Sequence, residues 1–186
     1  MKKVTLIFAL VFGLAATAQS TWKSDAAHSK VGFAITHLMI SEVEGHFGEF
    51  DITATATDAF EDIAFTVDIK TTSIDTDNSR RDDHLRSDDF FAVEKHPSIT
   101  FKTTGYEKTG DKTFSLTGDL TMHGTTKPVT LEGKVNGIIT DQRSQKLKAG
   151  LKITGTVNRL EFGVGGDTPS LGDDVDLTIN LEMAQQ

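Results

Sequence analysis

The chain has 186 residues, which is enough for one domain with a sizeable core. Acidic residues outnumber basic ones by 27 to 19, and this formal net charge of −8 argues against nucleic acid as a partner, because phosphate binding needs clusters of Lys and Arg. The sequence contains no Cys, which excludes thiol catalysis, thiolate metal sites and disulfides, so the fold must depend on packing alone.

The first 18 residues have the pattern of a secretory signal peptide. Lys2 and Lys3 precede an apolar run of about 13 residues, and Ala16-Thr17-Ala18 places small residues where a signal peptidase reads. A membrane anchor is the less favoured alternative, since spanning a bilayer takes about 20 apolar residues. We expect cleavage near Ala18, a periplasmic or secreted product, and one mature domain of residues 19–186. The loss of two Lys moves its net charge from −8 to −10.

From residue 30 onward, apolar and polar residues alternate, which is the period-2 pattern of strands with one buried face. Clusters of Gly, Asp, Asn and Lys that favour turns separate several of these segments. One-sided strands in this number fit an up-and-down barrel or a sandwich. The eight predicted strands are centred, in chain order, on residues 31–35, 50–56, 63–69, 99–103, 114–122, 129–135, 151–157 and 175–183.

Four glycines interrupt this alternation in an informative way. Gly48 falls where the apolar positions change phase between Phe47 and the strand that follows, so a bulge is expected there. Gly118, Gly133 and Gly155 lie in the middle of predicted strands, where a barrel needs sharp coiling or inner space.

One segment between the third and fourth strands breaks the pattern. Ser79-Arg80-Arg81-Asp82 matches the capping box [ST]-x-x-[DE], which predicts a short helix. Ser87 is a candidate cap for a second turn that carries Phe90 and Phe91. Because the paired phenylalanines need a surface to bury against, we expect the insertion, residues 78–91, to cover one open end of the barrel.

The histidines and hydroxyls do not form a recognisable reactive site. His28, His37 and His46 lie nine residues apart, whereas a metal site usually includes a pair of ligands at short spacing. Asp25, His28 and Ser29 are the residue types of a catalytic triad, but adjacent strand residues point to opposite faces and no G-x-S-x-G elbow occurs. We therefore predict separate hydrogen-bonding histidines, with no catalytic residue, metal or cofactor.

Taken in order, the motifs resemble those of the YceI-like family of lipocalin-like, polyisoprenoid-binding proteins. The resemblance runs from Trp22 to about Met183 and opens with W-x-x-D-x-x-H-S-x-V-x-F-x-x-x-H. Each single motif is weak, but the ordered set is highly specific. The later motifs are G-x-F-x-x-F from Gly45, P-x-I-x-F from Pro97, G-x-L-T-x-x-G-x-x-K from Gly118 and R-x-x-F-G from Arg159.

The resemblance implies an all-β, eight-stranded antiparallel lipocalin-like barrel with a short helical insertion covering one end and a long internal tunnel. It also implies a long-chain amphiphilic lipid as partner: a polyisoprenoid, an isoprenoid quinone, or a fatty acid or its amide. The implied role is storage or transport without chemistry, in a protein with no integral membrane anchor. Each buried CH₂ contributes about 0.8 kcal/mol, so a tail of ten or more carbons provides ample gross affinity.

The candidate ligand-binding residues are mainly the apolar positions that alternation places inside the barrel. One strand-end histidine and three apolar residues of the insertion join them. The full set is Phe33, Ile35, His37, Phe65, Val67, Leu85, Phe90, Phe91, Phe101, Leu116, Leu131, Ile153, Phe162 and Ile179.

Two alternatives to a binding protein stay open. Alternation alone does not distinguish a ligand cavity from a barrel filled by its own side chains, so a structural or stress-interaction protein is the first alternative. The second is an enzyme acting on a lipid with His28 or His37 as its base. The oligomeric state is also open, with a homodimer as one alternative.

Overall fold

The computed structural model describes residues 18–186, so the predicted signal peptide lies almost wholly outside the described residues. No helix among residues 18–186 is long and apolar enough to cross a membrane. One α-helix is described, α1 (Ser79–Arg86), together with the short 3-10 turns η1 (Ala26–His28), η2 (Thr71–Ser73) and η3 (Arg159–Phe162). The strands are β1 Ser20–Ser24, β2 Lys30–His37, β3 Ser41–Phe47, β4 Phe50–Ala56, β5 Ala64–Lys70, β6 Ile74–Asp75, β7 Ser98–Lys108, β8 Thr113–Met122, β9 Thr125–Thr140, β10 Leu147–Asn158 and β11 Leu171–Gln185.

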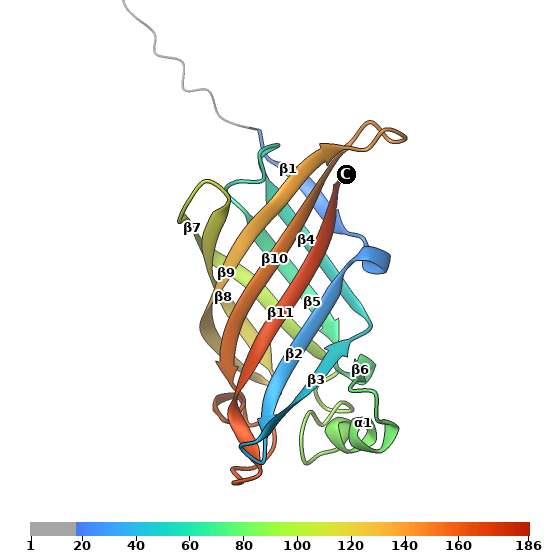
Figure 1. The fold of residues 1–186 in the computed structure, drawn as a ribbon, viewed down its shortest axis with the longest axis vertical. Coiled ribbons are helices and arrows are strands. Elements are labelled where there is room, and N and C mark those ends of the chain that lie inside the picture. Colours follow the sequence, from blue (N-terminus) through green and yellow to red (C-terminus); the bar gives the residue numbers. More distant parts are fainter. Residues whose placement is uncertain (1–17) are drawn as a thin grey trace, which may run out of the picture.

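These strands form one closed antiparallel barrel (Figure 1). Strand β11 closes the ring, because it pairs with β2 along most of its length and with β1 near its C-terminal end. Strands β1 and β2 form one interrupted strand of the barrel wall, and β3 and β4 form another, which is interrupted at Gly48. Counted in this way, the barrel has eight strands. The predicted barrel is confirmed, and the sandwich alternative is wrong.

The structure contains three strands that alternation did not predict: β1, β3 and β6. Strand β3 has only Val43 and Phe47 as apolar inward residues, because Gly45 takes the position between them. A Cβ at Gly45 would overlap the ring of Phe33 on β2, so the missing apolar side chain makes room for a neighbour. Gly48, where a bulge is predicted, lies instead in a break between β3, which ends at Phe47, and β4, which begins at Phe50, and its N–H donates to the carbonyl of Ser73.

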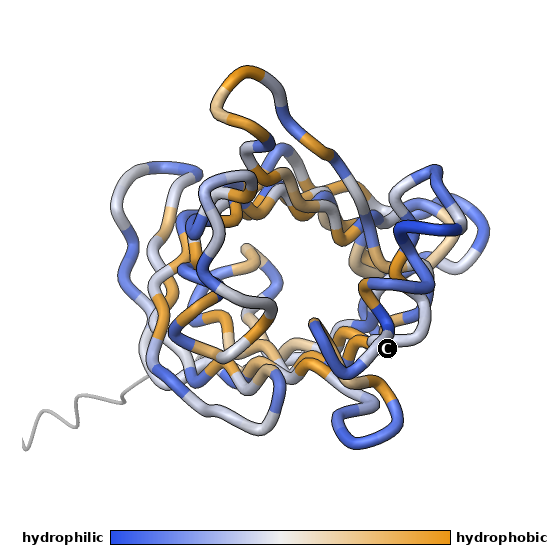
Figure 2. The backbone as a smooth tube through the Cα atoms, turned by 90° about the horizontal axis from the view of Figure 1, so that it is seen from below, coloured by the Kyte–Doolittle hydropathy of each residue, from blue (hydrophilic) through white to orange (hydrophobic). Residues whose placement is uncertain are grey.

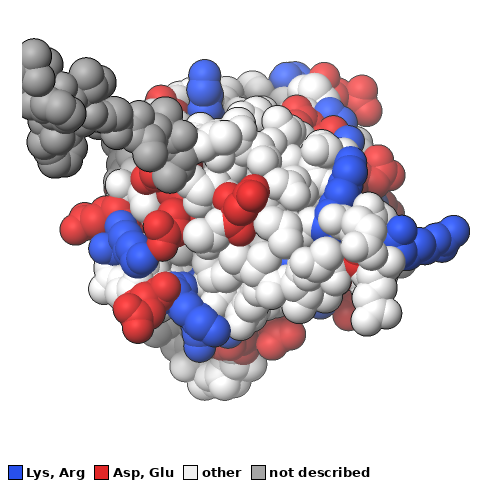
Figure 3. All heavy atoms as spheres, turned by 90° about the horizontal axis from the view of Figure 1, so that it is seen from above, with Lys and Arg blue, Asp and Glu red and all other residues white. Residues whose placement is uncertain are grey.

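One end of the barrel is filled by side chains, and we call it the tryptophan end. Trp22 is fully buried there, and its ring meets that of Phe60 edge to face with centroids 4.9 Å apart. Phe114 is also almost fully buried. We call these three residues the aromatic plug. Seen from this end, the visible surface is closed, and charged side chains lie mainly around its edge (Figure 3).

The opposite end carries α1, and we call it the helix end (Figure 1). The helix begins as predicted, but its cap is Asn78 rather than Ser79: the Asn78 side chain accepts a hydrogen bond of 3.1 Å from the N–H of Arg81. Asn and Ser are about equally favourable at the N-cap position, and here Asn78, the earlier of the two residues, is the N-cap. Seen from the helix end, the strands form a ring in which apolar and polar positions alternate (Figure 2).

Candidate functional site

The barrel interior contains a cavity of about 800 Å³ on the helix-end side of the aromatic plug. This volume lies within the range of about 300–1,000 Å³ typical of small-molecule sites. Val175 and Leu181 of β11 both line it. They are six residues apart, so the cavity follows this strand for at least about 20 Å. The interior is therefore filled at one end and hollow toward the other, which alternation alone could not distinguish.

Thirteen of the fourteen predicted residues line this cavity. Phe162 does not: it is buried in η3, outside the cavity wall. Contact between the thirteen residues and a ligand stays a prediction. The lining residues among the predicted set are Phe33, Ile35, His37, Phe65, Val67, Leu85, Phe90, Phe91, Phe101, Leu116, Leu131, Ile153 and Ile179.

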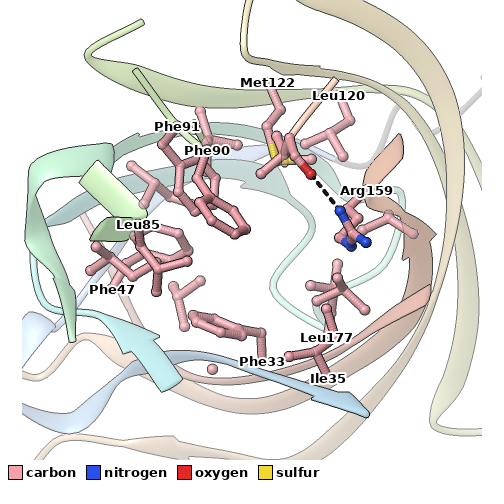
Figure 4. Close-up of a pocket in the computed structure, with 18 of the residues that line it drawn as sticks. Phe33, Ile35, Phe47, Leu85, Phe90, Phe91, Leu120, Met122, Arg159 and Leu177 are labelled. Carbon is pink, nitrogen blue, oxygen red and sulfur yellow. Dashed lines mark hydrogen bonds between the residues drawn. The ribbon is translucent and has the colours of Figure 1, made fainter. Parts of the chain in front are cut away.

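Several of these inward side chains are only partly buried. Phe33, Val67, Leu177 and Ile179 pack against the core yet keep accessible surface inside the barrel. Figure 4 shows Phe33, Ile35 and Leu177 on one side of the cavity and Phe90 and Phe91 across from them. Covering such accessible apolar surface with an apolar molecule is favourable, because it removes the surface from water.

The insertion supplies part of the cavity wall at the helix end. Leu85 of α1 and Phe90 and Phe91 in the turn after it line the cavity, and the Phe91 ring packs edge to face on Phe47 of β3, 5.9 Å between centroids. Ser87 accepts a hydrogen bond from the N–H of Asp89 at 3.3 Å, in line with its predicted role in this second turn. The insertion thus lies at one end of the barrel, as the sequence predicts.

Polar side chains surround the opening of the cavity at this end. We call the opening the mouth and these residues the polar rim: His37, Arg81, His84, Asp89, Thr168 and Ser170. Arg81 donates from Nε to the hydroxyl of Thr76 at 2.7 Å and from Nη2 to the Thr76 carbonyl at 2.6 Å. His84 Nε2 lies 3.3 Å from a carboxylate oxygen of Asp89. An apolar cavity with a polar rim matches the two parts of an amphiphile.

One wall residue that the sequence analysis did not select is Arg159, which is 3% exposed. Its guanidinium donates to the carbonyls of Val164 (2.9 Å), Gly166 (3.0 Å) and Gly172 (2.8 Å), and Figure 4 shows it at the cavity wall with one of these bonds dashed. Asp173 lies 3.5 Å away and balances its charge. Arg159 therefore fastens the loop between η3 and β11. The signal that could have found it is an Arg beside a Gly-rich loop, whose carbonyls lack strand partners.

Away from the cavity, Asp25, His28 and Glu182 are the one group within residues 18–186 that brings three metal-ligand side chains within 4.8 Å of one another. His28 Nδ1 lies 3.0 Å from Asp25, and Lys148 Nζ lies 2.7 Å from Glu182, so an ammonium group already pairs with one carboxylate. The hydrogen bond with His28 lowers the pKa of Asp25, and the same bond raises the pKa of His28. This cluster is an ion-pair network at the N-terminal end of β2.

Asp25, His28 and Ser29, which the sequence argues against as a catalytic triad, are not arranged as one in this network. The hydroxyl of Ser29 accepts a hydrogen bond of 3.1 Å from the backbone N–H of Glu182, and His28 is engaged by Asp25. Of the two candidate lipid-acting bases, His28 does not line the cavity, whereas His37 does, at the polar rim.

Comparison with known proteins assigns the chain to a family. The model of the YceI-like domain matches residues 22–183. Protein YceI of Escherichia coli O157:H7 is 39% identical over 194 residues, covering all of both chains. The crystal structure of the Campylobacter jejuni YCEI protein aligns with a TM-score of 0.76 and 32% identity, over 100% of this chain and 99% of that one. A polyisoprenoid binding domain of Saccharophagus degradans shares the fold, with a TM-score of 0.66 at 12% identity over 89% of this chain and 98% of that one. The chain therefore belongs to the YceI-like domain family.

Proposed function

We propose that the protein binds a long-chain hydrophobic molecule inside the barrel and performs no chemistry on it. The observation that carries this proposal is the apolar cavity, which is closed on the side of the aromatic plug and ringed by polar side chains at the other end. A ligand of matching chemistry has an apolar tail for the cavity and a small polar head for the rim. Polyisoprenoids, isoprenoid quinones, fatty acids and fatty amides have this form.

The energetics favour the tail as the main source of affinity. Each CH₂ moved from water into the cavity contributes about 0.8 kcal/mol, and the cavity runs about 20 Å along β11, long enough for many such groups. The twelve apolar lining residues of the predicted set would contact this tail, and His37 at the rim would face the head. Apolar contacts discriminate weakly between similar tails, so chain length and the fit at the rim would set selectivity.

Family membership and the polyisoprenoid binding domain among the structural relatives support a polyisoprenoid-like ligand. The N-terminal pattern of residues 1–18 supports export, so we propose storage or transport of this lipid in the periplasm or outside the cell. No observation favours His37 as a catalytic base over a hydrogen-bonding partner for a headgroup, and the proposal therefore stays with binding alone.

The test compares two Asp substitutions on neighbouring residues of β11. Leu177 faces the cavity and Thr178 faces solvent. Geranylgeraniol added to delipidated wild type at 100 times Kd should contribute about 2.7 kcal/mol of apparent stability, which raises the Tm by roughly 5–10 °C for a domain of this size. Leu177→Asp should abolish this rise, because an unpaired charge beside the tail is costly. Thr178→Asp should keep it.

Native mass spectrometry of protein purified without delipidation supplies the second readout. Bound lipid in the wild type and none in Leu177→Asp would support the proposal. If wild type carries no lipid and its Tm does not respond to geranylgeraniol, a fatty acid or a quinone, the binding proposal is wrong.

A further inference from the structure

The turn between β2 and β3 exposes three consecutive apolar side chains. Leu38, Met39 and Ile40 are 52%, 77% and 85% exposed, and with Ile139 they are the large hydrophobic residues that stand out in this way among residues 18–186. We call residues 38–40 the apolar tip. Turns at strand ends are normally built from small polar residues, so three large apolar ones in a row are unusual.

The backbone conformation of the apolar tip is also unfavourable for large apolar residues. Leu38 and Met39 have φ values of 52° and 61°, a left-handed conformation that Gly, Asn and Asp adopt most easily. The turn is nevertheless well held, because the N–H of Leu38 donates to Ser170 (2.9 Å) and that of Ile40 donates to His37 (3.2 Å). Apolar side chains that are exposed to water, on a backbone conformation that they adopt with strain, indicate a functional role at the surface.

The apolar tip lies directly beside the cavity mouth. His37, which precedes it, and Ser170, which accepts its hydrogen bond, both belong to the polar rim. Leu171, next to Ser170, and Ile35, two residues before His37, line the cavity itself. The exposed side chains of the tip are therefore separated from the apolar cavity wall by residues of the polar rim.

We propose that the apolar tip inserts into the surface of a lipid bilayer and sets the cavity mouth against it, so that a lipid passes between membrane and cavity with little exposure to water. This inference rests on the proposed function. Three protruding side chains are too few for a stable protein interface, which buries at least about 1,000 Å², but they suit shallow insertion at the level of the headgroups. A short apolar tip gives weak and reversible attachment, as repeated delivery requires.

Charge decides which bilayer the tip should prefer. The domain without residues 1–18 has a formal net charge of −10, which repels anionic headgroups. Attachment should therefore come from apolar insertion alone, be strongest on zwitterionic vesicles, and persist at high salt.

The first test uses the absence of Cys to place one fluorescent label. Met39→Cys and Ile139→Cys are each labelled with an environment-sensitive dye and mixed with phosphatidylcholine vesicles. Ile139 is the matched control, since it is 65% exposed and lies near the tryptophan end of β9, away from the mouth. A blue shift and increased emission at position 39 alone, unchanged by salt, is the expected result. No change at position 39, or equal change at both positions, overturns the proposal.

The second test separates docking from ligand binding. The double variant L38N/M39G places residues suited to positive φ in the turn, so it should fold at least as well as the wild type. It should lose vesicle binding in flotation and slow the transfer of a dansyl-labelled prenyl alcohol between phosphatidylcholine vesicles, while keeping the Tm rise with geranylgeraniol. Unchanged flotation and transfer would refute the docking role. Loss of the Tm rise in the wild type as well would instead count against the proposed function.

Discussion

Inside the barrel, three mid-strand glycines face large side chains on neighbouring strands. A Cβ at Gly118 would overlap the ring of Phe101, and one at Gly133 would overlap the ring of Phe114. Gly155 faces Leu131 in the same way, with its methyl carbon 2.5 Å from the Cβ position. These glycines let bulky side chains lie flat against the wall, so they determine how much of the interior stays hollow.

Gly118→Ala should destabilise the protein, because the added methyl group would also come within 2.7 Å of the Lys102 carbonyl, which cannot move aside. Overpacking of this kind costs about 1–3 kcal/mol. The matched control is Gly137→Ala on β9, where no heavy atom lies within 4 Å of the Cβ position. Chemical denaturation should show a loss of stability at position 118 and none at position 137. Equal effects would mean that the cost comes from backbone freedom rather than contact.

At the scale of residues, the sequence predicts well whether a strand side chain faces the interior, but it predicts poorly which residues that side chain contacts. Alternation assigns residues such as Phe101 and Ile179 to the interior, because a strand has only two faces. Phe162 lies in η3, where period-2 reasoning does not apply. The carbonyls that Arg159 gathers come from residues five to thirteen positions ahead, and no local pattern encodes that convergence.

At the scale of elements, α1 is joined by polar contacts to the segment that precedes it. The carboxylate of Asp82, 6% exposed, accepts from the N–H of Thr76 at 2.9 Å and from its hydroxyl at 2.6 Å. Arg86 donates to the carbonyls of Ile74 (2.7 Å) and Thr72 (2.9 Å). The helix is thereby tied to the segment just before it, next to the β6 edge.

Asp82→Ala should loosen α1, since it leaves two buried donors of Thr76 without an acceptor. A hydrogen bond to a charged group contributes about 1.5–3 kcal/mol to stability. Amide exchange over residues 79–91 should therefore accelerate by one to two orders of magnitude. Asp83→Ala is the control: its side chain is 79% exposed and pairs only with Arg86 among the described ion pairs. Hydrogen-exchange mass spectrometry that finds equal protection in both variants would contradict this anchoring role.

The local sequence predicts the helix itself, but it does not predict the contacts that attach the helix. A cap at Asn78 or Ser79 is visible in the sequence because capping uses residues three positions apart. The capping-box motif predicts that the Asp82 side chain caps the helix terminus, whereas in the structure it accepts hydrogen bonds from Thr76 in the preceding segment. The alternation of β1 and β6 is likewise too short to recognise, at five and two residues.

For the whole molecule, the two ends of the barrel differ in kind. The tryptophan end is filled by the aromatic plug, and Trp22 Nε1 is buried there without a hydrogen-bond partner. The helix end has the mouth, the polar rim and the apolar tip. Any exchange of ligand would therefore occur through one opening.

Trp22, the one Trp of the chain, reports on this asymmetry. Because it is 0% exposed and does not line the cavity, its emission should be blue-shifted, resist quenching by acrylamide, and stay unchanged when geranylgeraniol binds. Steady-state fluorescence checks all three points. A ligand-dependent shift in the emission maximum would mean that the tail reaches past Phe60 into the plug.

If the cavity binds a chain as proposed, a barrel with one closed end would also select the length of that chain. A linear chain would enter tail first, and its end would stop at the closed end of the cavity, short of the aromatic plug, whose three residues do not line the cavity. Chains shorter than the cavity, which follows β11 for at least about 20 Å, would leave apolar wall uncovered, while longer ones would fold back or hold carbon in water at the mouth. The position of this closed end, rather than any contact with the head, would then decide how many carbons fit best.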